Sequence, residues 1–239
     1  MNQSLQELWE SKTSGTCHKW VHYFEIYERY VNKFRNKNST YLEIGVQRGG
    51  SLDLMHEWLG EGAIIVGIDI DPGCKSLEQT GHNDYFKNNH KIHIGSQEDV
   101  AFLTEVATQH KEFDIIIDDG GHTSDQQIIS FKTLWPYLKF GGVYIVEDLH
   151  CSQYWPRFQD NRSTITFLQF AHGLSEQLSL WHYDEQLFHN RYNIPPEQRD
   201  NMSLPFESFA MNEIFSIAYF DSIIAIEKRQ ITEPYHKLQ

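Results

Sequence analysis

The chain has 239 residues, a length that suits one large domain with a substantial core. It carries 33 acidic and 20 basic residues, and this net charge of −13 argues against binding to nucleic-acid backbones, which needs lysine and arginine. The sequence has no stretch near the roughly 20 apolar residues of a membrane-spanning helix, and its first residues lack the features of a signal peptide. The three cysteines show no C-x-x-C spacing, so we expect a cytoplasmic protein without disulfides.

Helices and strands alternate along the first two thirds of the chain. Residues 1–38 form an N-terminal helical segment, in which apolar residues at helical spacing predict an amphipathic helix over 20–34. Apolar runs then predict strands, and the segments between them predict helices. The expected strands cover 41–44, 63–69, 91–94, 113–118 and 143–147, and the expected helices cover 51–59, 97–109 and 124 to about 136. Ser124 and Gln127 are the expected capping box of the last helix.

This order predicts a doubly wound, mostly parallel sheet in an α/β fold. Two β-rich runs, 213–220 and 222–228, are expected to close one edge of the sheet as an antiparallel pair. Residues 149–210 break the rhythm and contain many aromatic side chains, with helical character around 163–180. Because this insertion follows a strand end, we expect it to form a lid that covers a substrate. The whole chain, 1–239, is therefore expected to be a single domain.

A glycine-bearing loop follows the first expected strand. Its spacing is G-x-x-x-G-G over residues 45–50, which differs from the G-x-G-x-x-G of dinucleotide-binding loops. It also lacks the Gly-Lys-Ser/Thr of the loop that binds nucleoside triphosphates. Asp69 ends the second strand, where it can accept hydrogen bonds from ribose hydroxyls, and Asp71 is a neighbouring candidate. Gln97, after the third strand, can contact an adenine edge. Together these features favour a nucleoside-bearing ligand without a long phosphate chain; alternatively, the glycines only form a turn and Asp69 caps the next segment.

Two apolar strands end on pairs of carboxylates. The strand at 113–118 leads into Asp118-Asp119-Gly120-Gly121-His122, and the strand at 143–147 leads into Glu147-Asp148. The carboxyl ends of neighbouring parallel strands lie at the same edge of a sheet, so these carboxylates repel one another unless a cation lies between them. A hard divalent cation prefers such oxygen ligands. The alternative is an ordinary turn in the first segment and a solvated strand end in the second.

These motifs resemble those of a known enzyme family. Glu43-Ile44-Gly45 with the glycines after it, and Ile68-Asp69-Ile70-Asp71, resemble class I S-adenosylmethionine-dependent methyltransferases. Ile117-Asp118-Asp119-Gly120-Gly121-His122 and Val146-Glu147-Asp148-Leu149-His150 resemble the macrocin/mycinamicin sugar O-methyltransferases, which are metal-dependent. The resemblance covers residues 40–155. It implies a seven-stranded Rossmann-like sheet, the cofactors S-adenosylmethionine and Mg²⁺ or another hard divalent cation, and a small-molecule hydroxyl acceptor that is a sugar or macrolide-like natural product.

The resemblance also implies roles for single residues. Asp119, Glu147 and Asp148 would ligate the cation, and His122 would be the general base; an unperturbed histidine pKa of about 6.5 suits this task. The residues implied to bind the cofactor are Glu43, Gly45, Gly49, Ser51, Asp69, Gln97 and Asp118. The role of Asp118 itself stays open because side chains alternate along a strand. His18, His22 and His150 could border the cavity, but each is expected to be a supporting or surface residue, and none has an assigned role.

The chain departs from the family pattern in two places, with Gly121 where a serine is expected and Cys151 where a threonine is expected. The leading hypothesis is a Mg²⁺-dependent O-methyltransferase acting on a sugar or natural product. One alternative is a cephalosporin-hydroxylase-like enzyme of the same fold, although an iron oxygenase needs two histidines and a carboxylate and no second histidine accompanies His122 and Asp125. Another is a non-catalytic nucleoside-binding module. A homo-oligomer also stays open.

Overall fold

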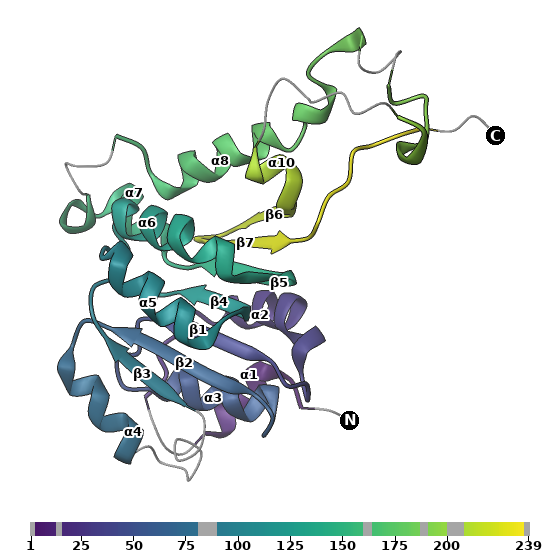
Figure 1. Cartoon of the computed structure of the whole chain (residues 1–239). Helices are drawn as coiled ribbons and strands as arrows, with labels where there is room; N and C mark the ends of the chain where they lie inside the picture. Colours follow the sequence, from purple (N-terminus) through teal and green to yellow (C-terminus); the bar gives the residue numbers. More distant parts are fainter. Residues whose placement is uncertain are drawn as a thin grey trace.

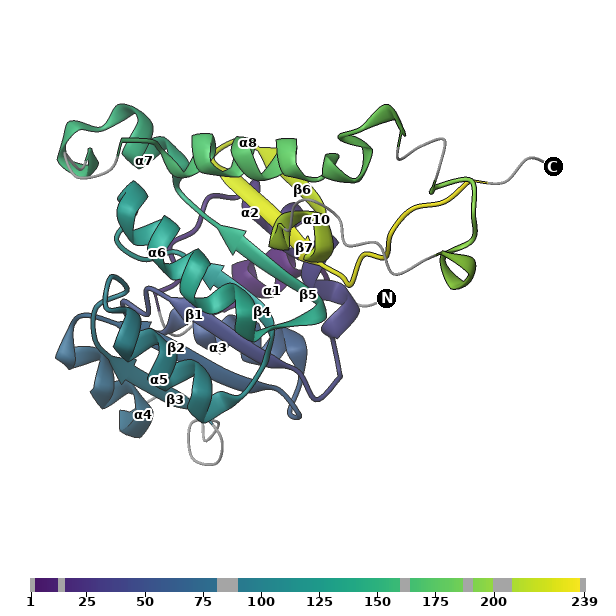
Figure 2. The same cartoon turned by 45° about the horizontal axis from the view of Figure 1, so that its top comes forward.

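The computed structural model describes residues 3–12, 16–80, 90–159, 164–186, 191–199 and 208–236. A seven-stranded sheet runs through the molecule, with helices on both of its faces (Figures 1 and 2). The strands are β1 (Thr40–Ile44), β2 (Ile64–Asp69), β3 (Lys91–Ile94), β4 (Phe113–Asp118), β5 (Leu138–Val146), β6 (Ile214–Phe220) and β7 (Ile223–Lys228).

The strand order is β3-β2-β1-β4-β5-β7-β6. Strands β1 to β5 pair in parallel, whereas β7 is antiparallel to both β5 and β6. The predicted doubly wound sheet with a C-terminal antiparallel pair is confirmed. The carboxyl ends of β1, β2, β3, β4 and β5 therefore lie at one edge, where open α/β sheets bind ligands.

The helices fill the connections between the strands. The α-helices among the described residues are α1 (Leu5–Ser11), α2 (Tyr23–Val31), α3 (Gly50–Leu59), α4 (Leu77–Thr80), α5 (Val100–His110), α6 (Ser124–Leu134), α7 (Leu149–Tyr154), α8 (Phe167–Gln177) and α10 (Phe209–Glu213). Short 3-10 helices cover Asn32–Phe34, Pro72–Ser76, Trp135–Tyr137, Pro156–Phe158, Leu180–His182 and Pro196–Gln198. None of the described helices is long and apolar enough to cross a bilayer.

Alternating side chains of the central strands feed two separate cores. Ile115 and Ile117 of β4 pack with α1, α2 and α3, whereas Ile116 packs on the opposite face with α5, α6 and α8. A strand covered on both faces needs apolar residues at every position, which explains the uninterrupted isoleucine run of β4. The same alternation decides which side of the sheet each polar residue at the end of a strand faces.

Helix α6 begins one residue away from the predicted capping box. Thr123, not Ser124, is the N-cap: its backbone is extended and its side chain accepts a hydrogen bond from the backbone N–H of Gln126, whose own side chain returns to Thr123. The prediction of Ser124 and Gln127 was therefore wrong by one position. The shift leaves Gln127 inside the helix, where its amide donates to the carbonyl oxygen of Glu147 at 2.9 Å.

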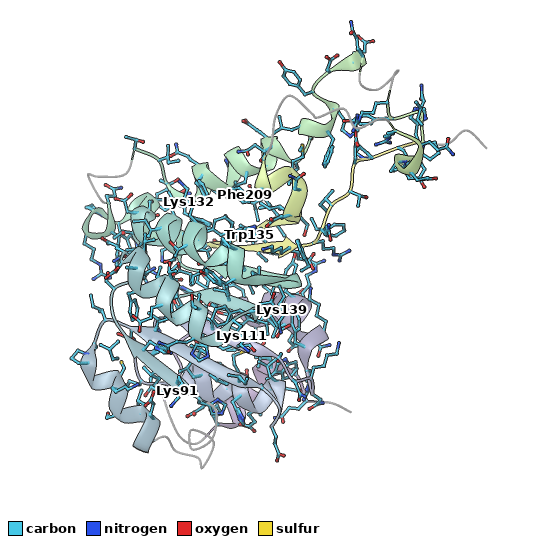
Figure 3. All side chains as sticks on the ribbon, viewed as in Figure 1. Lys91, Lys111, Lys132, Trp135, Lys139 and Phe209 are labelled. Carbon is cyan, nitrogen blue, oxygen red and sulfur yellow. The ribbon has the colours of Figure 1, made fainter. Side chains whose placement is uncertain are left out.

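The described residues among those expected to form a lid, 149–210, lie in two separate parts of the structure. Residues 149–159 lie directly after the acidic end of β5, whereas α8 packs against α6 and α10 over the second core. Figure 3 labels Trp135 and Phe209 on this same side of the molecule, and their ring centroids are 6.2 Å apart. Residues 160–163, 187–190 and 200–207, with Phe188 among them, lie outside the described residues. A lid role is still a prediction, and residues 149–159 are its closest part to the site.

Candidate functional site

A cavity of about 570 Å³ lies at the carboxyl edge of the parallel strands. Its wall is built by the segments that follow each of the five parallel strands, β1 to β5, and by residues 16–19 of the N-terminal segment. The predicted site residues that line it are Gly45, Ser51, Asp69, Gln97, Asp119, His122 and Asp148. Glu43, Gly49, Asp118 and Glu147 are not among the lining residues.

Gly45 is where the loops after β1 and β4 touch. Its φ is +97°, and a Cβ added there would lie 2.0 Å from the carbonyl oxygen of Asp119. Only glycine fits a left-handed backbone at such a close approach. The loop after β1 therefore lies directly against the residue that follows β4, and both line the cavity.

Asp69 holds the glycine loop from the neighbouring strand. One carboxylate oxygen accepts the backbone N–H groups of Val46 and Gln47 at 2.8 and 2.9 Å, and the other accepts the N–H of Asp71 at 2.9 Å. The carboxylate still lines the cavity, but much of its acceptor capacity is occupied by backbone. Asp71 also lines the cavity and accepts from Gly73 N at 2.8 Å. Hydrogen bonding of either residue to ribose stays a prediction.

Asp118 and Gln97 form a buried pair that supports the turn after β4. The Gln97 amide nitrogen lies 3.1 Å from Asp118 Oδ1 and 3.1 Å from Ser130 Oγ, while its oxygen accepts from Gly121 N at 2.7 Å. Asp118 also accepts from Gly120 N at 3.3 Å. Burial raises the pKa of Asp118 to about 7. Asp118 thus faces the loop backbone, and both residues position the turn that carries Asp119 and His122.

Asp119, His122 and Asp148 converge at the edge of the cavity. One ligand atom from each lies within 4.8 Å of the others, and His122 Nε2 is 4.0 Å from Asp119 Oδ1 and 3.8 Å from Asp148 Oδ2. These separations exceed a hydrogen bond and leave room for a small ligand between the side chains. His122 and Asp148 both adopt left-handed backbone conformations, with φ of 60° and 54°, a strain that is concentrated at functional sites.

The donor set fits a hard divalent cation. Asp119 and Asp148 supply carboxylate oxygens, the ligands that Mg²⁺ prefers. Burial lowers the pKa of His122, although Asp119 and Asp148 pull it upward, so the ring favours its neutral form. Nδ1 of His122 is buried without a hydrogen-bond partner among the described residues. A neutral imidazole beside two carboxylates can accept a proton from a ligand bound between them.

Glu147 is not part of this group of possible ligands among the described residues. Ile145 and Glu147 lie on the same face of the strand path, and Glu147 is buried on the side of the sheet that α2 covers. There its carboxylate lies 3.1 and 3.2 Å from Nζ of Lys19. The structure thus brings Asp119 and Asp148 together with His122. Glu147 lies beside them, in contact with the ammonium of Lys19.

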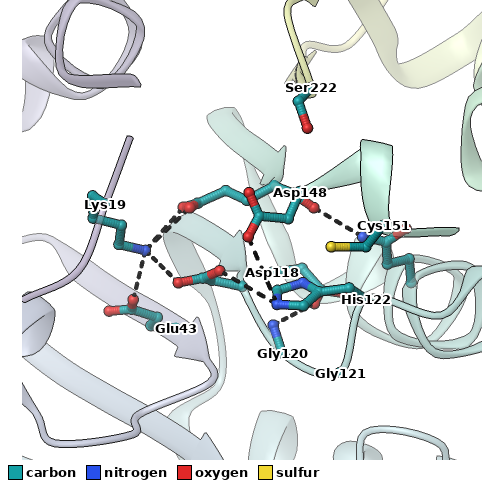
Figure 4. A network of polar contacts seen from close by, with 12 residues as sticks. Lys19, Glu43, Asp118, Gly120, Gly121, His122, Asp148, Cys151 and Ser222 are labelled. Atoms are coloured by element: carbon teal, nitrogen blue, oxygen red, sulfur yellow. Dashed lines mark hydrogen bonds and ion pairs between the residues drawn. The ribbon is translucent and has the colours of Figure 1, made fainter. Parts of the chain in front are cut away.

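Lys19 is the residue that the sequence reasoning missed. Its ammonium lies 2.6 Å from Asp119 Oδ2 and 3.2 Å from Glu43 Oε1, in addition to Glu147 (Figure 4). Burial by itself lowers the pKa of Lys19, but the surrounding carboxylates outweigh it and raise that pKa well above its usual value. No local motif marks Lys19. The only hint was electrostatic: clustered carboxylates need a cation, and a lysine from a distant segment meets part of that need.

An aromatic wall leads from the site to the surface; we define it as Trp20, His150, Trp155 and Phe158. Phe158 lies 5.9 Å from the His122 ring, Trp155 lies 4.6 Å from His150, and Trp20 lies 6.0 Å from His150, all between ring centroids. Trp20 and Trp155 are exposed. His18 lines the cavity, whereas His22 contacts the carbonyl oxygen of Asp221 at 3.1 Å.

Residues 42–149 match the family model described as a methyltransferase domain. The matched segment is thus a methyltransferase domain. The match begins within β1 and ends just after Asp148, so it contains the glycine loop and both acidic strand ends. The sheet order, with β7 inserted between β5 and β6, is that of the class I methyltransferase fold.

Curated relatives of the chain include O-methyltransferases of sugar-bearing natural products. Demethylmacrocin O-methyltransferase of Streptomyces fradiae is 33% identical over 174 residues, which is 67% of this chain and 41% of the relative. The 8-demethyl-8-alpha-L-rhamnosyl tetracenomycin-C 2'-O-methyltransferase of Streptomyces olivaceus is 35% identical over 165 residues, 63% of this chain and 41% of the relative. The chain spans less than half the length of these curated relatives.

A solved structure shares the fold over nearly the whole chain. The MycE methyltransferase from the mycinamycin biosynthetic pathway, in complex with Mg, SAH and mycinamycin VI, is 25% identical with a TM-score of 0.72. The alignment covers 98% of this chain and 55% of that one. A relative of known structure thus binds Mg and SAH together.

Proposed function

We propose that this protein is an S-adenosylmethionine-dependent O-methyltransferase, assisted by a divalent cation, that acts on a hydroxyl of a sugar or natural product. The observation that carries the proposal is the convergence of Asp119, His122 and Asp148 at the edge of a cavity bounded by the Gly45 loop and Asp69. The likeness to sugar O-methyltransferases and to the Mg- and SAH-bound MycE supports it.

The methyl donor is assigned to the 570 Å³ cavity. Gly45 and Ser51 are proposed to contact its amino-acid part, and Asp69 its ribose, with Gln97 toward the base, whereas Gly49 supports the loop as the N-cap of α3. Glu43 and Asp118 are proposed to act indirectly: Glu43 is buried against Lys19, and Asp118 supports the turn through Gln97. The reacting sulfonium would then lie beside the turn after β4.

The cation is assigned to Asp119 and Asp148, with Glu147 as a neighbouring carboxylate. A divalent cation bound there lowers the pKa of a hydroxyl that it contacts. His122 is proposed as the base rather than as a ligand, because Mg²⁺ prefers oxygen donors and Nε2 cannot bind the cation and take a proton at once.

The chemical step is a direct methyl transfer. The acceptor hydroxyl gives its proton to Nε2 of His122, its oxygen forms a bond to the methyl carbon, and the bond from that carbon to the sulfonium sulfur breaks. S-adenosylhomocysteine and the methyl ether leave, and His122 releases its proton to solvent. The aromatic wall is proposed to pack against the acceptor and to exclude water, which favours a step in which the positive charge leaves the sulfonium sulfur.

The hydroxylase alternative has less support. The group of possible ligands among the described residues contains one histidine and two carboxylates, not the two histidines and one carboxylate typical of non-haem iron oxygenases. A purely nucleoside-binding module would have no use for a strained His122 and Asp148 beside the cavity.

Calorimetric titration with S-adenosylmethionine, followed by a methyl-transfer assay on deoxysugar-bearing macrolides and simple glycosides with Mg²⁺, tests the proposal. We expect His122→Ala to retain cofactor binding while its transfer rate falls at least 100-fold, since a general base contributes roughly 10²–10⁴. His172→Ala, at an exposed position in α8, is the matched control. Absence of cofactor binding by the wild type would refute the proposal, and full activity of His122→Ala would refute the assigned base.

A further inference from the structure

Lys19 divides the carboxylates at the strand ends into two groups. Glu43 and Glu147 are almost fully buried, with side chains 0% and 1% exposed, and their cation contact is the lysine. Asp148 lies on the outer side, next to His122. Asp119 belongs to both groups, because its Oδ2 contacts Lys19 at 2.6 Å while its Oδ1 faces His122.

The lysine therefore occupies oxygens that a divalent cation would otherwise use. It takes one oxygen of Asp119 and both oxygens of Glu147. Its own side chain is only 6% exposed, so solvent screens its charge weakly. Figure 4 shows Lys19 beside Glu43 and His122 beside Asp148, on opposite sides of the network.

We propose that Lys19 sets the strength of divalent-cation binding at Asp119 and Asp148. Its fixed positive charge repels the incoming cation, and its contacts with both oxygens of Glu147 keep that carboxylate from binding the cation. The cation would then have few protein ligands and would keep coordination positions open for the acceptor hydroxyl. This inference rests on the proposed function, since it concerns the cation of the same site. It makes the N-terminal segment, which precedes the matched family domain, a determinant of the metal centre.

Removal of the charge should strengthen cation binding. In Lys19→Met, Asp119 and Glu147 lose their counter-charge and become free to bind the cation, and like charges that repel one another favour a divalent ion between them. We expect the dissociation constant for Mg²⁺, measured by calorimetry without any methyl donor, to fall at least tenfold. Lys19→Gln, which keeps N–H donors for the carboxylates, should do the same.

Two controls separate charge from packing. Lys19→Arg keeps the charge and should stay within threefold of the wild-type affinity. Lys33→Met breaks the ion pair of Lys33 with Glu227, distant from the cavity, and should leave the Mg²⁺ affinity unchanged. Without Mg²⁺ the neutral variants should melt below the wild type, and saturating Mg²⁺ should raise their Tm more than it raises that of the wild type.

The outcomes distinguish this inference from the proposed function. Mg²⁺ binding to the wild type that weakens or stays unchanged in both neutral variants would overturn the role of Lys19 and leave the enzyme assignment intact. Absence of Mg²⁺ binding in the wild type and in both variants would overturn both the inference and the metal assignment, while cofactor binding would be unaffected.

A measurement on the wild type covers the case in which the neutral variants do not fold. The buried ammonium of Lys19 is hydrogen-bonded on several sides, and its side-chain ¹⁵N resonance can be followed by NMR during a Mg²⁺ titration. We expect this resonance to shift in step with metal occupancy while that of Lys33 does not. A Lys19 resonance whose chemical shift does not change at saturating Mg²⁺ would overturn the proposal.

Discussion

The hydroxyl of Tyr23 lies 2.9 Å from Oδ1 of Asp148 and 3.3 Å from its backbone nitrogen. Tyr23 begins α2 and is fully buried, whereas Asp148 follows β5 in a left-handed conformation with φ of 54°. The tyrosine thus donates to the carboxylate and accepts from the amide of the same strained residue. One side chain from the N-terminal helix fixes both the backbone and the carboxylate of a proposed cation ligand.

Tyr23→Phe should loosen Asp148 without opening the core, because only the hydroxyl is lost. We expect about a tenfold weaker Mg²⁺ affinity, as is typical when a partner that orients a metal ligand is removed, and a loss of about 1–2 kcal/mol in the free energy of unfolding. Calorimetry and urea denaturation measure the two effects. Tyr219→Phe, whose hydroxyl pairs with Ser175 over α8, is the control. An unchanged Mg²⁺ affinity in Tyr23→Phe would contradict the role given to this hydroxyl.

Gly45→Ala should damage the cofactor site. The new methyl group would meet the carbonyl oxygen of Asp119 at 2.0 Å in a backbone conformation that alanine avoids, so the two loops must separate. We expect at least a tenfold loss of S-adenosylmethionine affinity by calorimetry. Gly173→Ala in α8 meets nothing within 4 Å and should instead stabilise the protein by up to about 1 kcal/mol. Normal cofactor affinity in Gly45→Ala would show that this contact is dispensable.

Local patterns in the sequence predict much of this arrangement. The isoleucines of β4 and the apolar runs of β1 and β2 predict strands with both faces covered, and their alternation with helices predicts the parallel sheet. The predicted ends of β4 agree with the structure because Asp118 and the glycines after it stop the apolar run. The convergence of Asp119, His122 and Asp148 follows from the same topology, since they follow neighbouring strands.

Contacts between distant segments carry no such pattern. Lys19 and Asp119 are 100 residues apart, and nothing next to Lys19 indicates that it enters the sheet edge. Glu147 contacts Lys19 whereas Asp148 contacts Tyr23, and this difference depends on the left-handed backbone of Asp148, which no motif encodes. The one-residue error at Thr123 arose because two adjacent hydroxyl residues each have a glutamine three positions later, and only backbone conformation decides between them.

The start of α6 allows a direct test of that correction. Thr123→Ala removes the N-cap and should lower the free energy of unfolding by about 1 kcal/mol. Ser124→Ala, inside the first turn, should cost less than half as much. Urea denaturation of both variants gives the comparison. Equal losses, or a larger loss for Ser124→Ala, would indicate that the helix begins where the sequence suggested.

Acidification should destabilise the protein through His90. Its Nδ1 accepts the backbone N–H of Ile65 at 3.0 Å, and burial lowers its pKa to about 4. In the unfolded chain a histidine has a pKa of about 6.5. As the pH falls below that value, the unfolded state therefore binds a proton that the folded state does not bind. The stability associated with neutral His90 is thus present above pH 6.5 and is lost as the pH falls toward 4.

His90→Asn should remove this dependence, because the amide oxygen can accept the same N–H without titrating. We expect the wild type to lose about 1–2 kcal/mol more than His90→Asn between pH 7 and pH 5, measured by denaturation at each pH. His172→Asn, at an exposed position, should follow the wild type. Parallel pH curves for the wild type and His90→Asn would contradict the assignment.

The turn between β6 and β7 also bears on the order in which the protein matures. The carbonyl oxygen of Ser222 accepts the N–H of Leu149 at 3.0 Å, and its hydroxyl contacts His150, so the turn braces the segment right after Asp148. A nascent chain released from the ribosome only as far as residue 213 has β1 to β5 and every proposed ligand, yet lacks this brace. The segment after the proposed ligand Asp148 therefore gains this support only once the last two strands of the sheet have been synthesised.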